Sequence, residues 1–201
     1  VTDTRDTQGK AERSLREFIA SGHPLFYLMS ADEERVAGLL RRVAQPPVGK
    51  PVPLWTWSVT EGMRAGDGQP DGTTDPRAAL DFIAQHATPG IFHLEDFHEA
   101  MRDSAVVRRR LRDLFALCKE RSQFVVVISA PVRAIPEELA ASLLYIELGV
   151  PDFPEMRAYL VQQAAAFAGA GLWVDTRDTT LDLLARALLG LTLSEAGFAL
   201  R

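Results

Sequence analysis

Apolar residues follow two patterns along the first 150 positions, short continuous runs and longer stripes with helical spacing. The run from Pro24 to Met29 is continuous and lies between two helical stripes. One of these stripes, at residues 36–43, places an apolar side chain every three or four positions. Continuous runs between amphipathic helices are typical of parallel strands that are buried on both faces. The pattern therefore predicts an α/β fold with right-handed crossovers.

Five strands and five intervening helices are expected in this region. The predicted strands cover residues 23–30, 52–60, 89–96, 123–130 and 143–150. The predicted helices cover residues 11–22, 30–45, 75–87, 104–122 and, as a short element, 135–143. Ser30 and Glu33 form a capping-box pattern, and Asp75 precedes Pro76 as an N-cap residue would. Residues 61–75 are rich in glycine, aspartate and proline and are expected to form a loop.

The pattern changes to all-helical after "PDFP". Three helices are expected, at residues 155–171, 179–190 and 192–201. The border near Gly149–Pro154 predicts two parts, an α/β core over residues 1–148 and a small helical subdomain over residues 149–201. The first ten residues are polar and the segment "PPVGKP" is expected to end the helix before it.

Composition narrows the class of protein without identifying it. The 201 residues are 47% hydrophobic and 24% charged, which suits a soluble domain with a real core. The net charge of -5 argues against a general nucleic-acid binder. A single cysteine allows no internal disulfide and favours a reducing compartment. With no apolar run of about 20 residues and no signal peptide, we expect a cytoplasmic protein and no membrane partner.

The stretch "GIFHLED" ends a predicted strand with two carboxylates, Glu95 and Asp96. In ATPases with a phosphate loop, such a strand end holds magnesium, and glycines with a lysine after the first strand cradle the phosphates. Here the junction after the first strand reads "FYLMSADEERVAG", with no glycine before Gly38 and no lysine. Asp32, Glu33 and Glu34 also place negative charge where phosphates would bind. The usual phosphate site is therefore expected to be absent, which leaves Glu95 and Asp96 as a degenerate Walker-B-like pair.

An ordered set of segments carries a family resemblance. These are "PLFYLMSADEERVAGLLRR", "LWTWSVTEGM", "DPRAALDFI", "GIFHLEDFH", "VVRRRLRDL" and "FVVVISAPVRAIPEEL". Together they resemble the N-terminal half of the AAA+ ATPase family of the conserved reading frame (Ycf) forty-six type. The resemblance implies a parallel five-stranded, P-loop-NTPase-like (AAA+) sheet flanked by helices, followed by a lid-like helical subdomain. The chain departs from a working AAA+ domain at Ser129 and Ala130, where a polar sensor such as asparagine is expected, and it has no arginine finger between Pro136 and Phe153.

The resemblance implies that this chain is a fragment, and the first residue, Val1, favours the same interpretation. It implies a non-catalytic AAA+-like module for assembly, regulation or partner recognition, with no cofactor of its own. ATP and magnesium would bind in a following ATPase domain of the same protein. That domain, a second copy of the chain and an unknown protein client are the expected partners. One alternative is weak binding of ATP and magnesium through Glu95 and Asp96.

Three further groups of residues could carry function. Residues 101–121 hold seven basic and three acidic side chains, which gives a charge of +4. They could form a solvated face with pairs such as Arg109–Asp113, or they could contact a protein partner. As a second alternative function, they could form a nucleic-acid-binding surface. Trp55 and Trp57 point the same way on their strand and belong either to the core or to a partner-facing patch. His93, Glu95 and His98 are not expected to bind metal. Cys118 is expected to be a buried apolar residue. The candidate partner contacts are Arg108, Arg109, Arg110, Arg112, Trp55 and Trp57.

Overall fold

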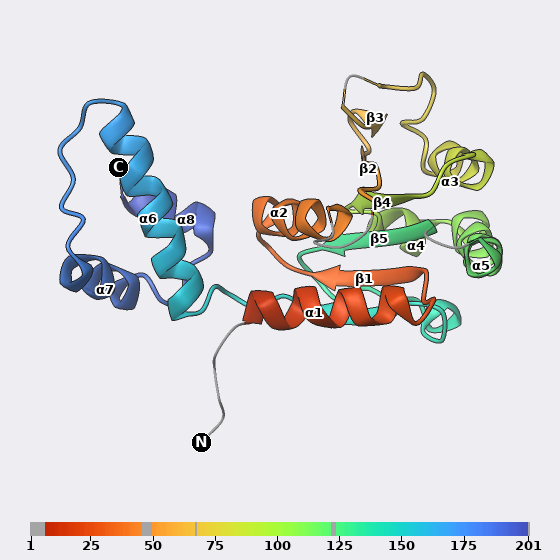
Figure 1. Ribbon diagram of the computed structural model, residues 1–201. Helices are drawn as coiled ribbons and strands as arrows, with labels where there is room; N and C mark the ends of the chain where they lie inside the picture. Colours follow the sequence, from red (N-terminus) through yellow and green to blue (C-terminus); the bar gives the residue numbers. More distant parts are fainter. Residues whose placement is uncertain (1–6, 46–49, 67, 122–123, 201) are drawn as a thin grey trace. The chain divides into compact units, whose positions relative to one another are not determined.

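The computed structural model describes residues 7–45, 50–66, 68–121 and 124–200 (Figure 1). The predictions for the polar N-terminus and for "PPVGKP" fall largely on residues 1–6 and 46–49, outside the described residues. The chain divides into two compact units. One is Glu12–Glu147, and the other is Leu148–Arg201 together with the start of the chain up to Ala11.

The larger unit is built around a six-stranded sheet with the order β3-β2-β4-β5-β1-β6. All neighbouring pairs are parallel except β2 and β3. The α/β class with a mainly parallel sheet is confirmed, with one strand more than expected. The strands are β1 (Leu25–Met29), β2 (Leu54–Ser58), β3 (Gly62–Arg64), β4 (Gly90–Glu95), β5 (Phe124–Ala130) and β6 (Leu144–Glu147).

The additional strand, β3, lies inside the segment that was expected to be a loop. Met63 pairs with Trp57 across the hairpin and is fully buried. Its backbone N–H donates to the Thr73 hydroxyl at 2.8 Å, and the indole Nε1 of Trp57 donates to the Thr73 carbonyl at 2.6 Å. One apolar side chain in a polar segment is thus enough to extend the sheet, because Thr73 satisfies the polar groups around it.

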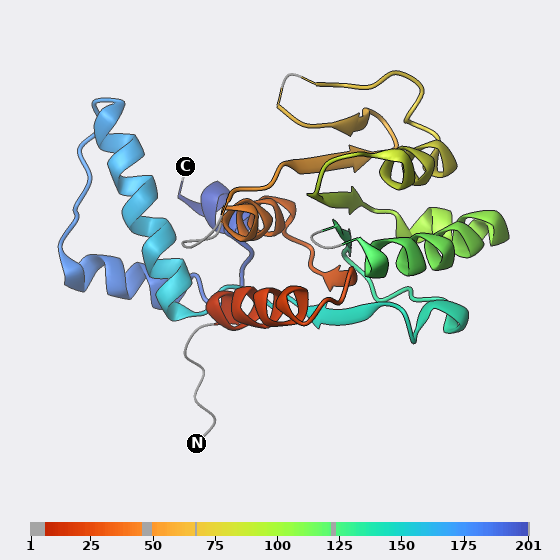
Figure 2. The ribbon, with the colours of Figure 1, turned by 45° about the vertical axis from the view of Figure 1, so that its right-hand side comes forward.

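Helices cover both faces of the sheet (Figure 2). One face packs against α3 (Pro76–Gln85), α4 (His98–Asp103) and α5 (Ala105–Glu120), and Leu25 and Tyr27 of β1 belong to this core. Phe26 and Leu28, which alternate with them, are also buried and point to the opposite face. On that side lie α1 (Thr7–Ala20) and α2 (Glu33–Ala44). The short helix α4 was not predicted, and the expected helix at 135–143 is a single 3-10 turn, η1 (Glu137–Leu139).

N-cap residues were predicted for two helices, and one of these predictions is correct. Asp75 caps α3 by accepting a hydrogen bond from the Ala78 N–H at 2.9 Å, with Pro76 in the first turn. The predicted Ser30–Glu33 capping box is wrong, because α2 begins two residues later. Asp32 is its N-cap and accepts from the Arg35 N–H at 3.1 Å, while Ser30 Oγ accepts from the backbone of Asp32. Both side chains can cap, and the later one is used.

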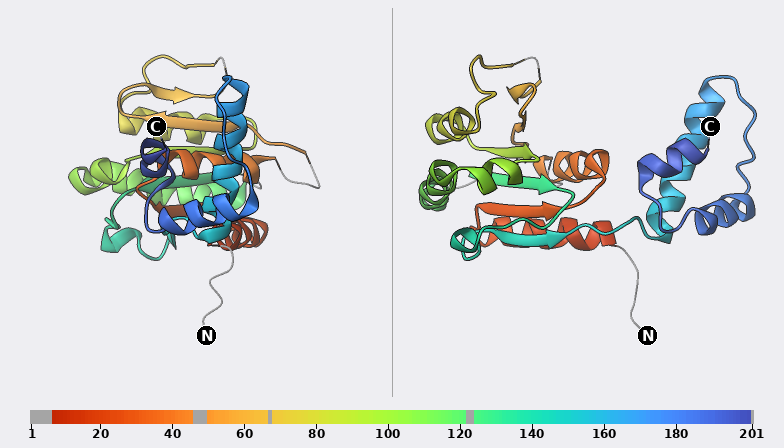
Figure 3. Two further views of the ribbon diagram at one scale, coloured as in Figure 1. Left: turned by 90° about the vertical axis from the view of Figure 1, so that its left-hand side faces the viewer. Right: turned by 180° about the vertical axis from the view of Figure 1, so that it is seen from behind.

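The smaller unit contains α6 (Phe153–Gly169), α7 (Asp178–Ala187) and α8 (Leu193–Ala199), which Figure 3 shows from two further sides. Capping boxes begin α6 at Asp152 and α8 at Thr192. The core of this unit is small and consists of Met156, Leu160, Leu181, Ala185 and Ala196. Among the helices of the described residues, none is long and apolar enough to span a membrane.

Candidate functional site

The connection between β1 and α2 lies where an ATPase would hold its phosphates, at the carboxyl end of the parallel strands. Only Ser30, Ala31 and Asp32 separate the two elements. The Ser30 N–H donates to the Ala130 carbonyl at 2.9 Å, which ties the connection to the neighbouring strand. This short connection contains no glycine, whereas a phosphate loop uses glycines to bring backbone N–H groups around the phosphates.

A small acidic cavity remains at this edge of the sheet. Its volume is about 120 Å³, whereas ligand pockets measure roughly 300–1,000 Å³. Three carboxylates belong to it, those of Glu33, Glu95 and Asp96. The other lining residues are Ser30, Ala31, Val36, Ser129, Ala130 and Pro131.

The expected Walker-B-like pair lies in this cavity. Burial raises the pKa of the Glu95 carboxyl, the charges of Glu33 and Asp96 raise it further, and the Arg64 guanidinium partly opposes them. Asp96 has a left-handed backbone with φ of 51° and donates its N–H to the Ser129 carbonyl at 2.9 Å. Asp tolerates this conformation better than most residues, so it fits a sharp turn at the strand end.

His93 lies on β4, the same strand as Glu95, and its side chain is buried in the core. Its Nε2 is 2.7 Å from the Ser129 hydroxyl, and its Nδ1 is 3.8 Å from a Glu95 oxygen. Burial lowers the pKa of His93 to about 4, so the ring is neutral at pH 7. His98 Nε2 lies 3.2 Å from a Glu99 oxygen, and its Nδ1 lies 3.8 Å from an Asp96 oxygen. In the parts of the chain that the structure describes, no group of His, Cys, Asp and Glu residues could hold a metal ion.

Three of the four arginines of α5 each meet a different carboxylate. Arg109 pairs with Asp113 at 2.5 Å, as the spacing predicts. Arg108 pairs with Glu138 of η1. Arg110 Nε donates to Asp81 of α3 at 2.6 Å.

Three consecutive arginines therefore point in three directions, because successive residues are rotated by about 100° around a helix. Arg112 is placed differently from these three. Its Nε is buried and has no hydrogen-bond partner. These pairs engage three of the seven basic residues between positions 101 and 121. For Arg109, the structure shows the expected salt bridge with Asp113 on a solvent-exposed face.

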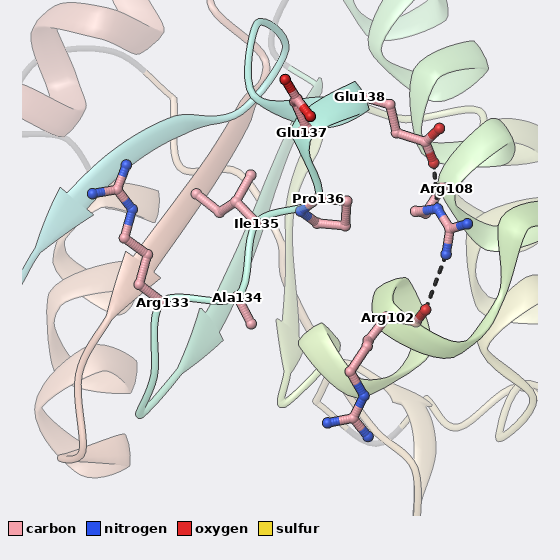
Figure 4. Close-up of a pocket in the computed structure, with 8 residues that line it drawn as sticks. All are labelled: Arg102, Arg108, Arg133, Ala134, Ile135, Pro136, Glu137 and Glu138. Carbon is pink, nitrogen blue, oxygen red and sulfur yellow. Dashed lines mark hydrogen bonds and ion pairs between the residues drawn. The ribbon is translucent and has the colours of Figure 1, made fainter.

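A groove of about 780 Å³ lies between α4, the start of α5 and the segment before η1 (Figure 4). Arg108 lies on one side of it and donates to the backbone carbonyls of Met101 and Arg102 at 2.9 and 3.0 Å, in addition to its pair with Glu138. Arg133 lies on the other side of the groove, with its guanidinium 4.6 Å from the ring of Tyr145.

This groove was missed from the sequence, because Arg133 and Arg108 are 25 positions apart and only the tertiary fold joins them. Tyr27 of β1 fixes the segment that carries Arg133. Its hydroxyl donates to the Val132 carbonyl at 2.6 Å and accepts from the Ala134 N–H at 3.2 Å.

The two tryptophans of β2 pack inward. Trp57 is 2% exposed and meets Phe97 edge-on at 5.0 Å. Trp55 is partly buried against Phe82 and His86. The pair does point the same way, as expected, but towards the helix-covered face. The expectation of a partner-facing patch is wrong for Trp57, because almost none of its side chain is accessible. Cys118 is buried too, and burial raises the pKa of its thiol to about 11.

Comparison with known proteins agrees with the α/β fold of the larger unit. A family model described as SpoVK-like AAA ATPase, N-terminal domain, matches residues 11–148. An uncharacterized AAA domain-containing protein ycf46 from Guillardia theta is 25% identical over 189 residues, which cover 91% of this chain and 35% of the relative. The protein of the same name from Gracilaria tenuistipitata var. liui is 23% identical over 152 residues, or 74% of this chain and 30% of the relative. The chain thus spans about a third of the length of these relatives.

Proposed function

The chain belongs to the family of SpoVK-like AAA ATPase N-terminal domains, and from this premise we propose that it is a non-catalytic AAA+ module that serves assembly or partner recognition. The resemblance to the Ycf forty-six type is confirmed by the relatives. We place the ATPase site, with its ATP and magnesium, in the remaining part of a longer protein. The neighbouring ATPase domain is then the first partner to consider, ahead of a second copy or a protein client.

The observation that carries this proposal is the acidic cavity at the carboxyl end of β1. Asp32 caps α2 and is buried, and Glu33 and Glu34 occupy its first turn. These acids already complement the positive end of the helix dipole. A phosphate at 4–6 Å from one of them would meet a repulsion of about 1 kcal/mol in water and about 4 kcal/mol at an effective dielectric of 20. Several such contacts offset what a helix terminus can offer to an anion.

The rest of the unit supports a scaffold role, because helices cover both faces of its sheet and its core is buried. Leu25, Tyr27, Leu94 and Ile128 are all fully buried where the strands meet α3 and α5. A buried core of this kind can hold surfaces in a fixed geometry, which is consistent with recognition.

Calorimetric titration of this chain with ATP and magnesium, followed by ADP, tests the proposal. We expect no saturable heat up to millimolar nucleotide, and a longer protein that includes the ATPase part provides the positive control. Binding tighter than about 100 µM, equivalent to about 5.5 kcal/mol, would refute the proposal.

A second candidate function is weak magnesium-nucleotide binding at Glu95 and Asp96. The left-handed backbone at Asp96 is the observation that favours it, because unusual backbone conformations cluster at functional sites. Asp96→Ala separates the two functions. Magnesium-dependent binding that this variant abolishes would support the second candidate, whereas binding that it leaves intact would place the nucleotide elsewhere.

A further inference from the structure

Exposed apolar side chains are concentrated in the helical unit. Of the twelve large hydrophobic side chains that are exposed among the described residues, eight lie between Val150 and Phe198, a quarter of the chain. Monomeric domains normally cover apolar side chains that gather at one place. The eight residues are Val150, Val161, Leu172, Trp173, Leu183, Leu184, Leu189 and Phe198.

Several of these side chains border one groove of about 500 Å³. Leu160 and Leu181, which belong to the core of the unit, also line it. Trp173, at 88% exposure, and Leu184 stand at its border. The remaining lining residues are Gln163, Ala164, Phe167, Leu172, Val174, Asp175 and Leu200.

The chemistry of the groove selects an apolar partner. Asp175 is its only charged residue, and this carboxylate already accepts hydrogen bonds from Arg177 at 2.6 Å and from the Thr180 hydroxyl at 2.8 Å. The groove therefore offers no free charge to an ionic ligand. A large, exposed tryptophan beside leucine and phenylalanine is typical of an anchor point in a protein interface.

We propose that this groove receives an apolar face of the longer protein, from the part that lies C-terminal to the helical unit. The chain spans about a third of its relatives, and its family is an N-terminal domain, so most of the relatives' length lies beyond the matched region. The family match ends at residue 148, and the helical unit follows it towards that remaining part. The inference rests on the proposed function, in which this chain is a module beside an ATPase.

Hydrogen exchange measured by mass spectrometry tests the docking. Exchange at residues 172–184 is compared between this chain and the full-length protein. We expect these amides to exchange at least tenfold more slowly in the full-length protein. Trp173→Glu should remove this difference, since it places a charge in the groove without disturbing the core. Leu183→Glu is the matched control, because Leu183 is 70% exposed and does not line the groove.

Two outcomes would overturn the proposal. Equal exchange in the two proteins would show that the remaining part does not cover the groove. Protection that appears in this chain alone and grows with its concentration would show that a second copy covers it. Neither outcome depends on nucleotide binding by this chain, so the calorimetric titration can fail or succeed separately.

Discussion

Replacement of His93 by glutamine should remove a large part of the acid sensitivity of the fold. The imidazole extends from β4, is buried, and forms a hydrogen bond with the hydroxyl of Ser129 on β5. Protonation would leave a charge in the core. Glutamine can keep a hydrogen bond to Ser129 and stays neutral at every pH, so the variant retains the contact and loses the titration.

The magnitude follows from the pKa of His93, which falls from 6.5 to about 4 on folding. Because the unfolded chain binds this proton more readily, the free energy of unfolding decreases as the pH drops below 6.5, and it stops changing below about pH 4. Each pKa unit corresponds to about 1.4 kcal/mol. Between pH 7 and pH 5 the wild-type protein should therefore lose about 2 kcal/mol through His93 alone.

Urea denaturation of both proteins at pH 7, 6 and 5 measures this difference. The other histidines and Glu95, whose own pKa is raised, are present in both proteins, so their contributions largely cancel when the two pH profiles are subtracted. We expect a residual slope of about 1 kcal/mol per pH unit or slightly more between pH 6 and pH 5. Parallel profiles would show that His93 does not carry a lowered pKa and would refute the reasoning.

Three further predictions concern local features of the fold. Asp75→Ala should lower the free energy of unfolding by about 1 kcal/mol, measured in urea, because α3 loses its N-cap, and an unchanged value would contradict the capping geometry. Gly62→Ala should destabilise the protein more than Gly66→Ala in thermal melts, since both have positive φ but only at Gly62 would a Cβ lie 2.7 Å from Thr73 Oγ1. Cys118 should react with a thiol reagent at pH 8 only at the rate of unfolding, because its pKa is raised to about 11, and fast labelling in native buffer would contradict this.

The main elements of the α/β unit follow from the sequence because they depend on local patterns. Continuous apolar runs gave β1, β4 and β5, and the Asp75–Pro76 pair gave the start of α3. The junction between β1 and α2 has no glycine before Gly38 and no lysine, and the proposal that the phosphate loop is absent rests on this local pattern. The predicted N-cap of α2 was wrong because two nearby residues, Ser30 and Asp32, can both cap a helix.

Side-chain partners that are far apart in the sequence could not be predicted, because they are set by distances that the chain order does not contain. Arg108 meets Glu138 and Arg110 meets Asp81, each about thirty positions away. Trp57 could have faced a partner until the hairpin with Met63 and the contact with Phe97 fixed it in the core. The apolar groove below Trp173 likewise exists only once α6 and α7 pack together. The sequence determined which backbone elements form, through propensity and periodicity, and tertiary packing decided which side chains remain available for binding.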